Sequence, residues 1–401
     1  MDRSTKQDAA CDEKQLLVCC ARTRMEPAIA EQVRELVARP LDWDYVFNEA
    51  IDHSIEPLLD RNLRAVGPNA APPAEMERLK IATRANTVRC LFLTAELHKI
   101  LDLFRTAGIV AIPYKGPVLA EQAYADLTLR DFDDLDIILP QRDLAKAHDA
   151  IRSLGYRARF PWVLDSRASA SQIPGEYNYR NEERRVMVEL HTEFTLRHFP
   201  VAPDLDEFGR RLEAVLVGGR EVRTFAAEDL LTALCIHGSK DFWERISWIA
   251  DISELVQRYP KFDWDQVLRT AETLHAGRMV HLGLALAADL LGAPLPEEIS
   301  YRVRCDIEAR VLAGEITRRL LSRDRVPFDS RGRLRFRRRM VDGQLEGWRY
   351  SIRLAMVPAE EDWEVVRLPG ALTPLYLVLR PLRLLRKYGW TGRGRQDTSS
   401  S

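Results

Sequence analysis

The chain has 401 residues, of which 46% are hydrophobic and 30% are charged, a composition typical of globular domains with their own cores. Because 59 Lys and Arg residues oppose 60 Asp and Glu residues, the formal charge of -1 argues against a nucleic-acid or membrane partner recognised through overall charge. The six cysteines form no C-x-x-C pair, no apolar run approaches a membrane span, and residues 1–8 lack the apolar core of a secretory signal. These features predict a cytoplasmic protein without a zinc knuckle or a disulfide framework.

Residues 1–90 are expected to form an N-terminal helical region, in which prolines separate successive helices. The helical pattern continues to about residue 107, and its last helix is the clearest, because apolar residues recur at helical spacing before Gly108, which stands where a C-terminal cap belongs. The apolar stripe of this helix consists of Leu93, Leu97, Ile100, Leu101 and Phe104.

From residue 109 the pattern changes to short apolar runs, which are typical of strands. We therefore predict an α+β protein in which residues 91–200 form a core around a small mixed β-sheet. The expected strands are 109–114, 135–139, 156–160, 176–180 and 185–194, with helices at 117–125 and 141–154 and a loop at 161–174.

Beyond residue 203 the chain is expected to return to helix, and residues 201–388 form the predicted C-terminal helical domain, the larger of the two helical regions. A helix running from Lys240 to Asp251 would place Lys240, Glu244 and Trp248 on one stripe, from which Lys240 would reach a triphosphate. The same stripe fits a surface of ion pairs around one packed tryptophan. Residues 389–401 are predicted to be a disordered tail. The expected helices are 226–238, 243–257, 263–276, 279–291 and 297–321.

Asp134 and Asp136 are the candidate metal ligands. They lie two residues apart at the start of an apolar run that reads as a buried strand, so their carboxylates leave the same face and can share a cation. The D-x-D pattern alone is weak evidence, because it occurs five times in this chain. At Asp42 and Asp263, each followed by a tryptophan and a helical pattern, N-capping explains it.

A third carboxylate, that of Glu189, is expected on the same face if the two strands are neighbours, because Val188 and Leu190 then face the core. Three carboxylates repel one another unless a divalent cation holds them together, and oxygen ligands favour Mg²⁺ or Mn²⁺. The sequence therefore predicts a metal site of Asp134, Asp136 and Glu189, suited to two-metal phosphoryl or nucleotidyl transfer. Glu189 would alternatively accept the proton of the attacking hydroxyl. The competing interpretation is a solvated acidic loop beside a sheet-edge glutamate.

The Lys115-Gly116-Pro117 turn is the candidate phosphate site. It stands at a predicted helix N-terminus, where free N–H groups favour an anion and glycine lets a phosphate approach the backbone. His191 shares the face of Glu189 and would orient the Glu189 side chain without binding the metal itself. His237 is more typical of a buried histidine with a satisfied hydrogen bond.

These residues resemble the uncharacterised bacterial nucleotidyltransferases of the polymerase-beta-like superfamily, some of whose genes lie among peptide natural-product clusters. The resemblance covers roughly residues 80–260. It rests on Tyr114-Lys115-Gly116, Tyr124, Leu129-Arg130, Asp134-Leu135-Asp136-Ile137-Ile138-Leu139, Val188-Glu189-Leu190-His191, His237-Gly238-Ser239-Lys240 and Trp248-Ile249-Ala250-Asp251.

The resemblance implies that Asp134 and Asp136 are the metal pair, that Glu189 is the third acid, and that Gly116 lies in the phosphate-binding turn. Better-known members carry Gly-Ser or Gly-Gly at this turn, so Lys115 would replace the missing hydroxyl as a point charge. Lys115, Gly116, Arg130 and Lys240 are accordingly expected to bind the nucleotide.

The combined prediction is an Mg²⁺-dependent nucleotidyltransferase that moves an NMP group from an NTP to a hydroxyl of an unknown acceptor and releases pyrophosphate. The acceptor is a small molecule, a peptide or protein side chain, or RNA, and the C-terminal helical domain is expected to select it. A sugar transferase or a dehalogenase-type phosphatase is disfavoured, because in those enzymes the apolar strand precedes the D-x-D. A non-catalytic nucleotide-binding or adaptor protein is disfavoured, because unused acids would only repel one another.

One further motif is a basic run with interleaved apolar residues, which favours either an RNA or phosphate-rich ligand, or a solvated face that pairs with the acidic run Glu360-Glu361-Asp362. The second interpretation is preferred. The run consists of Arg331, Arg333, Arg335, Arg337, Arg338 and Arg339.

Overall fold

The computed structural model describes residues 11–159, 175–193, 208–324, 328–357 and 375–388, together with the single positions 362, 365, 366, 368 and 372. The predicted loop at 161–174 and the predicted tail at 389–401 lie outside these residues. The architecture is mixed α+β with a small mixed sheet, as the sequence predicted.

The N-terminal region is helical, and its last helix is much longer than the others. Prolines stand in the first turns of three of its helices, where their missing N–H groups carry no cost. Asp42 caps the third helix by accepting a hydrogen bond from the Tyr45 amide, as predicted. The helices are α1 (Asp12–Cys20), α2 (Pro27–Val37), α3 (Trp43–Asp52), α4 (Glu56–Val66) and α5 (Pro73–Thr106).

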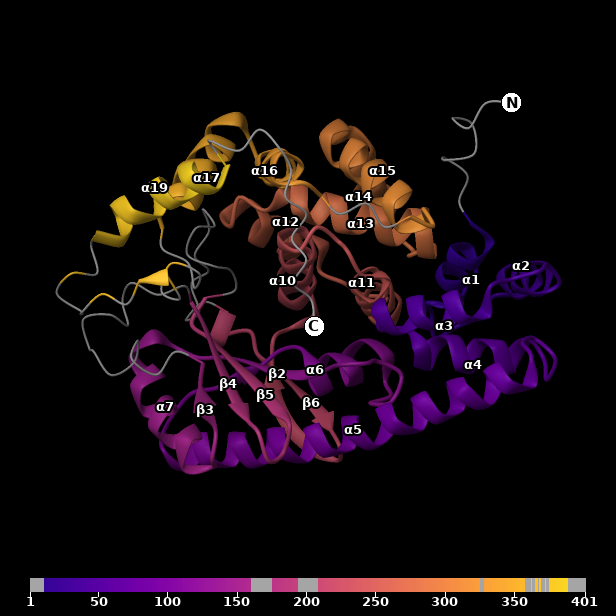
Figure 1. Ribbon diagram of the computed structural model, residues 1–401, viewed down its shortest axis with the longest axis horizontal. Helices are drawn as coiled ribbons and strands as arrows, with labels where there is room; N and C mark the ends of the chain where they lie inside the picture. The colour runs from indigo at the N-terminus through magenta and orange to yellow at the C-terminus, as the bar shows by residue number, and fades with distance from the viewer. Residues whose placement is uncertain are drawn as a thin grey trace.

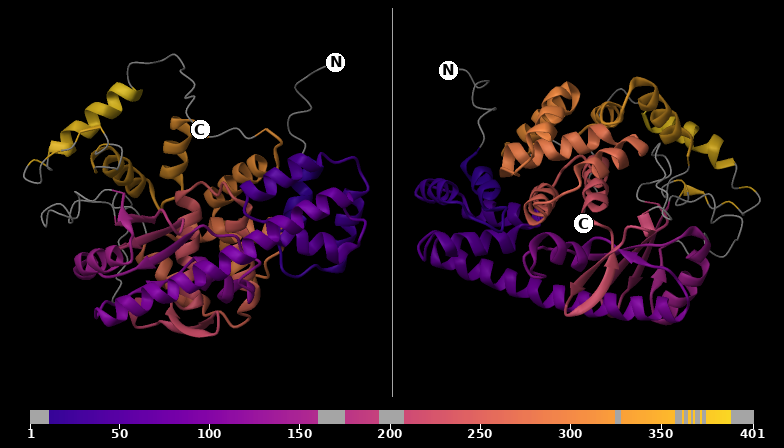
Figure 2. Two further views of the ribbon diagram at one scale, coloured as in Figure 1. Left: turned by 60° about the horizontal axis from the view of Figure 1, so that its bottom comes forward. Right: turned by 180° about the vertical axis from the view of Figure 1, so that it is seen from behind.

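Helix α5 has 34 residues and extends beneath both the N-terminal helices and the sheet (Figures 1 and 2). The boundary predicted after residue 90 therefore falls inside one continuous helix. The N-terminal half of α5 packs against α4, and its C-terminal half packs against the sheet. Because the helix has no break, the N-terminal region and the sheet are joined by one rigid element.

The sheet has five strands in the order β1-β2-β5-β4-β3, and only the central β2–β5 pair is parallel. The predicted strands are all present among the described residues, although β1, β3 and β5 are shorter than expected. The strands are β1 (Ile112–Pro113), β2 (Asp134–Ile138), β3 (Arg157–Ala158), β4 (Glu176–Asn181) and β5 (Val186–His191). The connections contain α6 (Gly116–Leu119), a π-helical turn η1 (Ala120–Tyr124), a 3₁₀ turn η2 (Gln141–Asp143) and α7 (Leu144–Ser153).

The two faces of the sheet differ in polarity because successive side chains alternate. Leu135, Ile137, Val188 and Leu190 point to one face and join a core with α5 and α7. Asp134, Asp136 and Glu189 point to the other face, which lies toward the C-terminal helices (Figure 1). The alternation in the sequence therefore decided which face became the polar one.

A two-stranded hairpin, β6 (Glu213–Val217) and β7 (Arg220–Thr224), follows the sheet. The sequence analysis assigned neither a helix nor a strand to this part of the chain. Gly218 and Gly219 form its turn, both with positive φ, as two-residue hairpins require. The hairpin packs on α6 and η1 beside the edge strand β1.

The C-terminal region consists of helices that are separated by short turns. The two helices expected at 226–238 and 243–257 are present as α10 and α11, and the continuous helix from Lys240 to Asp251 that was considered for Lys240 does not form, because α10 ends at Lys240 and α11 begins at Ile246. The predicted helix 297–321 is divided at Asp306, whose side chain caps the second part. None of the described helices is long and apolar enough to cross a membrane. The helices are α10 (Ala227–Lys240), α11 (Ile246–Arg258), α12 (Trp264–Thr273), α13 (Gly277–Leu291), α14 (Glu297–Cys305), α15 (Ile307–Leu321), α16 (Ser330–Arg339), α17 (Gln344–Met356) and α19 (Tyr376–Tyr388).

Candidate active site

The candidate site is built on the two central strands of the sheet. Because β2 and β5 run parallel, Asp136 lies directly beside Glu189, and Asp134 precedes Asp136 on the same face. His191 lies two residues beyond Glu189 and projects from the same face. The three acids that the sequence singled out therefore do share one face, as predicted if the strands were neighbours.

Two cationic groups contact the carboxylate of Asp136. The Lys115 ammonium donates to Oδ1 at 2.8 Å, and the His191 Nε2 lies 3.0 Å from the same oxygen. His191 Nε2 also lies 3.5 Å from Glu189 Oε2. Asp136 and His191 are nearly inaccessible to solvent, so these charges interact through a medium of low polarity.

The cluster perturbs the protonation of its members. Burial would raise the pKa of Asp136, but Lys115 and His191 hold that pKa well below its usual range. The pKa of His191 rises to about 9 although burial opposes it, because Asp136 and Glu189 stabilise the imidazolium. Burial, followed by the charges of Asp136 and Glu189, raises the pKa of Asp134 to about 7. The ionised form of Asp134 is repelled by the carboxylates of Asp136 and Glu189, and a cation bound nearby would reduce this repulsion.

A metal ion fits the donor atoms present. Oxygen atoms of Asp136 and Glu189 and a ring nitrogen of His191 all lie within 4.8 Å of one another. Two carboxylates with an imidazole suit Mn²⁺, and the carboxylates alone suit Mg²⁺. His191, which the sequence suggested only as a supporting residue, belongs to this group, whereas Asp134 does not. The role of Asp134 as a ligand stays a prediction.

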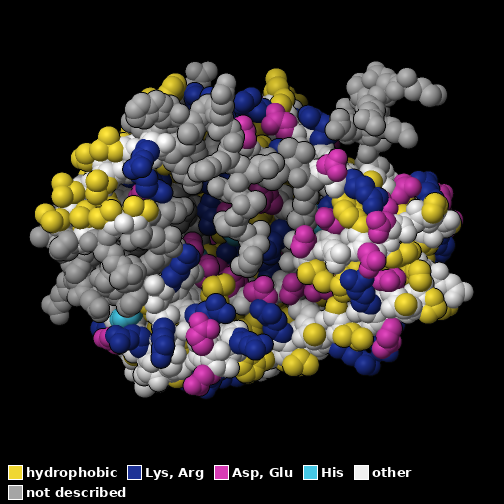
Figure 3. Space-filling view, in the orientation of Figure 1, with side chains coloured by type: hydrophobic (Ala, Val, Ile, Leu, Met, Phe, Trp, Pro, Cys, Tyr) yellow, Lys and Arg dark blue, Asp and Glu magenta, His cyan; other side chains and the backbone are white. Residues whose placement is uncertain are grey.

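These residues line a cavity of about 370 Å³ between the polar sheet face and the helices α10 and α11. All the predicted side chains reach it: Lys115, Arg130, Asp134, Asp136, Glu189, His191, His237 and Lys240. Figure 3 shows acidic and basic side chains gathered around the hollow at the centre of this face, above α5. The size suits a small-molecule ligand.

Comparison with known proteins decides the family. A protein family described as "Uncharacterised nucleotidyltransferase" matches residues 39–292, which is more than half of the chain. The chain belongs to this nucleotidyltransferase family. The family relationship predicted from the sequence is therefore confirmed.

The solution structure of the antibiotic-resistance factor ANT(2'')-Ia is similar to this nucleotidyltransferase family member. The two chains share 14% sequence identity with a TM-score of 0.31, and the match covers 47% of this chain and 91% of that chain. A search of curated proteins found no match.

Gly116 of this nucleotidyltransferase family member stands next to the acidic cluster. Its φ of +53° is unfavourable for other residues, and a Cβ atom here would lie 3.2 Å from the Asp134 carbonyl oxygen. Glycine therefore permits the turn to approach β2 closely. The helix α6 that follows has only four residues before it becomes π-helical.

Arg130 is held by a long-range ion pair. Its Nε and Nη2 donate to the two carboxylate oxygens of Asp251 in α11 at 2.9 and 3.1 Å, and Tyr124 Oη also donates to Asp251 Oδ1 at 2.8 Å. All three side chains are buried. This contact joins the core to the C-terminal helices.

Lys240, at the end of α10, is only weakly paired. Its ammonium lies 3.8 Å from Glu176 on β4 and 3.8 Å from Asp241. Both side chains of the Lys240–Glu176 pair are about four-fifths buried, which keeps the lysine inside the cavity. Glu176 belongs to the site but was not predicted, because nothing in the sequence indicated which helix would face β4.

His237 and Trp248 form an aromatic wall of the same cavity. Their ring centroids are 5.2 Å apart with the rings nearly perpendicular. Burial, followed by the nearby charges of Lys115 and Lys240, holds the pKa of His237 well below its usual value, so this ring is neutral. Ser54 and Arg245 also line this cavity, and no pattern in the sequence indicated that either residue belongs to the site.

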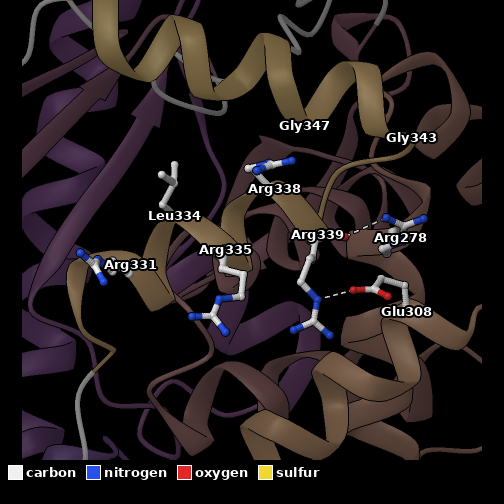
Figure 4. Close-up of a pocket in the computed structure, with 9 residues that line it drawn as sticks. All are labelled: Arg278, Glu308, Arg331, Leu334, Arg335, Arg338, Arg339, Gly343 and Gly347. Carbon is white, nitrogen blue, oxygen red and sulfur yellow. Dashed lines mark hydrogen bonds and ion pairs between the residues drawn. The ribbon is translucent and has the colours of Figure 1, made fainter. Parts of the chain in front are cut away.

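The basic run lies on α16 and lines a separate cavity of about 710 Å³ (Figure 4). Asp362, the described residue of the acidic run, binds Arg380 and Arg383 of α19, and its predicted pairing with the basic run stays a prediction. Arg339 instead pairs with Glu308 and Glu315 of α15. Glu360 and Glu361 lie outside the described residues. The other residues around this cavity are Arg278, Arg331, Leu334, Arg335, Arg338, Gly343 and Gly347.

Proposed function

We propose that this protein transfers a nucleoside monophosphate from an NTP to a hydroxyl group of an acceptor and releases pyrophosphate. The observation that supports this most strongly is the register of the parallel β2–β5 pair, which places Asp136 beside Glu189 in a cavity that also holds cationic side chains. In the reaction the acceptor oxygen forms a bond to the α-phosphorus, the bond from that phosphorus to the β-phosphate oxygen breaks, and pyrophosphate leaves.

The residues divide into acids that hold the metal and cations that hold the phosphates. Asp136, Glu189 and His191 would hold Mg²⁺ or Mn²⁺, with Asp134 as an additional acid. A bound divalent ion supplies charge stabilisation for the phosphates during transfer. Lys115 and Lys240 bind phosphate oxygens in this proposal, and Arg130 positions the turn before β2 through Asp251.

Lys115 has a double role in the proposal. Its ammonium neutralises Asp136 in the structure, at 2.8 Å. When the triphosphate enters, Lys115 turns to the phosphates and frees the Asp136 oxygen. Glu189 accepts the proton from the acceptor hydroxyl, because its side chain remains partly accessible in the cavity.

A non-catalytic nucleotide-binding protein is the second candidate, because Lys115 and His191 already neutralise Asp136 without a metal. The two candidates differ in their need for a divalent ion. A catalytic site requires the ion, whereas a purely cationic site binds nucleotide without it.

The test combines binding and turnover. Each of the four labelled NTPs is offered with Mg²⁺, with Mn²⁺ and with a chelator, using cell extract as the acceptor source, to the wild type, Asp136→Asn and Glu189→Gln. We expect labelled product and pyrophosphate from the wild type, with turnover reduced more than about 100-fold in both variants. Mn²⁺ affinity, measured by calorimetry, falls in parallel.

Glu182→Gln is the matched control, since Glu182 lies in the exposed turn between β4 and β5 of the same sheet. Its turnover and metal affinity should equal those of the wild type. Nucleotide binding that persists in the chelator and is unchanged in Asp136→Asn would contradict the proposal and favour the non-catalytic candidate.

A further inference from the structure

A second cavity, of about 960 Å³, adjoins the candidate active site. We call it the α5 groove. It shares Ser54, Asp131, Asp133 and Arg245 with the catalytic cavity, so the two cavities adjoin at these residues. Its other residues are Ile51, Asp52, Glu56, Ala82, Ala85, Asn86, Val88, Arg89, Phe92, Leu93, Arg184, Arg185 and Glu244.

The inner end of the α5 groove contains an unusual carboxylate. Glu56 is only 6% exposed, and its Oε2 has no hydrogen-bond partner among the described residues. The carboxyl group has a backbone hydrogen bond, but a buried carboxylate oxygen without a partner is costly and rare in native structures. Burial raises the pKa of Glu56 to about 8, and the charges of Asp131 and Asp133 contribute. This end of the groove therefore lacks a cation.

Four arginines line the groove, Arg89, Arg184, Arg185 and Arg245, and the exposed Arg185, like the other three, is not paired with Glu56 among the described residues. Arg89 pairs with Asp133, and Arg184 pairs with Glu96 outside the groove. Arg245 donates to Ser54 Oγ at 3.3 Å. None of them forms an ion pair with Glu56 among the residues that the structure describes.

A single metal ion does not fit the inner end either. Among the described residues, only Asp136, Glu189 and His191 bring three ligand atoms within 4.8 Å. The carboxylates of Glu56, Asp131 and Asp133 are therefore too far apart for one ion. An extended organic cation with several N–H donors can contact carboxylates that are separated in this way.

The outer wall of the groove is apolar. Ile51 of α3 and Val88 and Phe92 of α5 line it, with exposed fractions of 44%, 69% and 45%. Large exposed apolar side chains that line a cavity are typical of a binding site. The groove is thus apolar along α5 and acidic where it meets the catalytic cavity.

We propose that the α5 groove binds the acceptor, and that the acceptor is an amphipathic organic cation whose amine or guanidinium group pairs with Glu56. The apolar part of this molecule lies on Val88 and Phe92, and its hydroxyl reaches the catalytic cavity past Asp131 and Asp133. The acceptor role rests on the proposed nucleotidyl transfer. It assigns acceptor selection to the N-terminal helices, whereas the sequence had suggested the C-terminal ones.

The test uses three probes that share a phenol and differ in charge: tyramine, neutral N-acetyltyramine and anionic 4-hydroxyphenylpropionate. Binding to the full chain is measured by ligand-observed NMR. We expect tyramine to bind at least about 10-fold more tightly than either other probe, since a hydrogen bond to a charged group is involved. Glu56→Gln should abolish this preference, whereas Glu77→Gln, on the exposed surface of α5, should retain it.

A second pair of variants tests the groove itself. Val88→Lys places a positive charge in the groove and should weaken tyramine binding at least about fivefold through like-charge repulsion. Leu91→Lys lies on the same helix, is 53% exposed and does not line the groove, so tyramine binding should be unchanged. Equal binding of the three probes, or equal loss in both lysine variants, would overturn the inference.

Metal-dependent nucleotide binding is measured in the same preparations, with Asp136→Asn as its own negative control. Nucleotide binding without any charge preference among the probes would sink the groove inference and leave the proposed function intact. The tyramine preference without nucleotide binding would refute the nucleotidyl transfer, and with it the acceptor role. Both results together support the inference.

Discussion

At the scale of single residues, the site is a balance of buried charges. Asp136 has a strongly favoured charged state because Lys115 and His191 surround it, while Asp134, two residues away, has a pKa raised to about 7. Identical side chains on one strand thus behave differently because their neighbours differ. Such separation of pKa values is typical of functional sites.

Glu56 provides a prediction about pH. Its folded pKa of about 8 lies above the ordinary value of 4.5, so the folded state binds this proton more tightly than the unfolded state. Below pH 4.5 the Glu56 carboxyl is protonated in both the folded and the unfolded state, so it does not reduce the free energy of unfolding. As the pH rises from 4.5 to about 8, the unfolded state loses this proton while the folded state keeps it, and the free energy of unfolding falls. We expect Glu56→Gln to be about 2–4 kcal/mol more stable than the wild type at pH 9 and equally stable at pH 4.

Chemical denaturation at both pH values measures this difference. Glu77→Gln serves as the comparison, because Glu77 is exposed on α5 and pairs only with Lys80. A difference that is the same at both pH values would contradict the assignment of the effect to the Glu56 carboxyl.

At the scale of elements, the turn between α10 and α11 shapes the catalytic cavity. Phe242 and Trp243 both have positive φ, which is strained for side chains of this size. The turn is held because the Trp243 ring is fully buried against Gly238 of α10 and Gly283 of α13. The same turn brings Lys240, Asp241 and Arg245 to the cavity.

Gly238→Ala tests this arrangement. Its Cβ would lie 2.6 Å from the Trp243 ring, which has no room to move, so we expect a loss of about 1–3 kcal/mol of unfolding free energy. Gly314 in α15 has nothing within 4 Å of an added Cβ, so Gly314→Ala should stabilise by up to about 1 kcal/mol. Thermal unfolding of both variants gives the comparison. Equal effects would show that the close contact with Trp243 is unimportant.

At the scale of the whole molecule, buried polar contacts as well as apolar ones join the sheet region to the C-terminal helices. The Arg130–Asp251 pair is the most specific, since two residues 121 positions apart form two hydrogen bonds while buried. Removing one partner of such a pair leaves an uncompensated buried charge. The double replacement is expected to be far less harmful.

We therefore expect Arg130→Met to lose about 3–5 kcal/mol of stability, and Arg130→Met combined with Asp251→Leu to recover most of it. Lys240→Met should leave stability unchanged and weaken NTP binding, because Lys240 is only loosely paired. Unfolding curves and nucleotide titrations measure the two effects. A stable Arg130→Met variant that fails to bind NTP would assign Arg130 to the nucleotide instead.

The local parts of the site were readable in the sequence. Period-two alternation placed Glu189 opposite Val188 and Leu190, and the D-x-D before an apolar run identified β2. The N-caps at Asp42 and Asp263 were likewise predicted and are confirmed. Each of these inferences depends on residues a few positions apart, where the geometry of a strand or a helix turn is fixed.

The sequence by itself thus determined the polar sheet face and the acids on it, as well as the family. Only the tertiary structure decided that Lys115 and His191 contact Asp136, that Arg130 is committed to Asp251, and that Ser54 of the N-terminal region lines the catalytic cavity while Glu56 lines the groove beside it. The hairpin β6–β7 was also decided at this level. The physical reason is that these contacts join residues distant in the chain, and periodicity carries no information about which surfaces will meet.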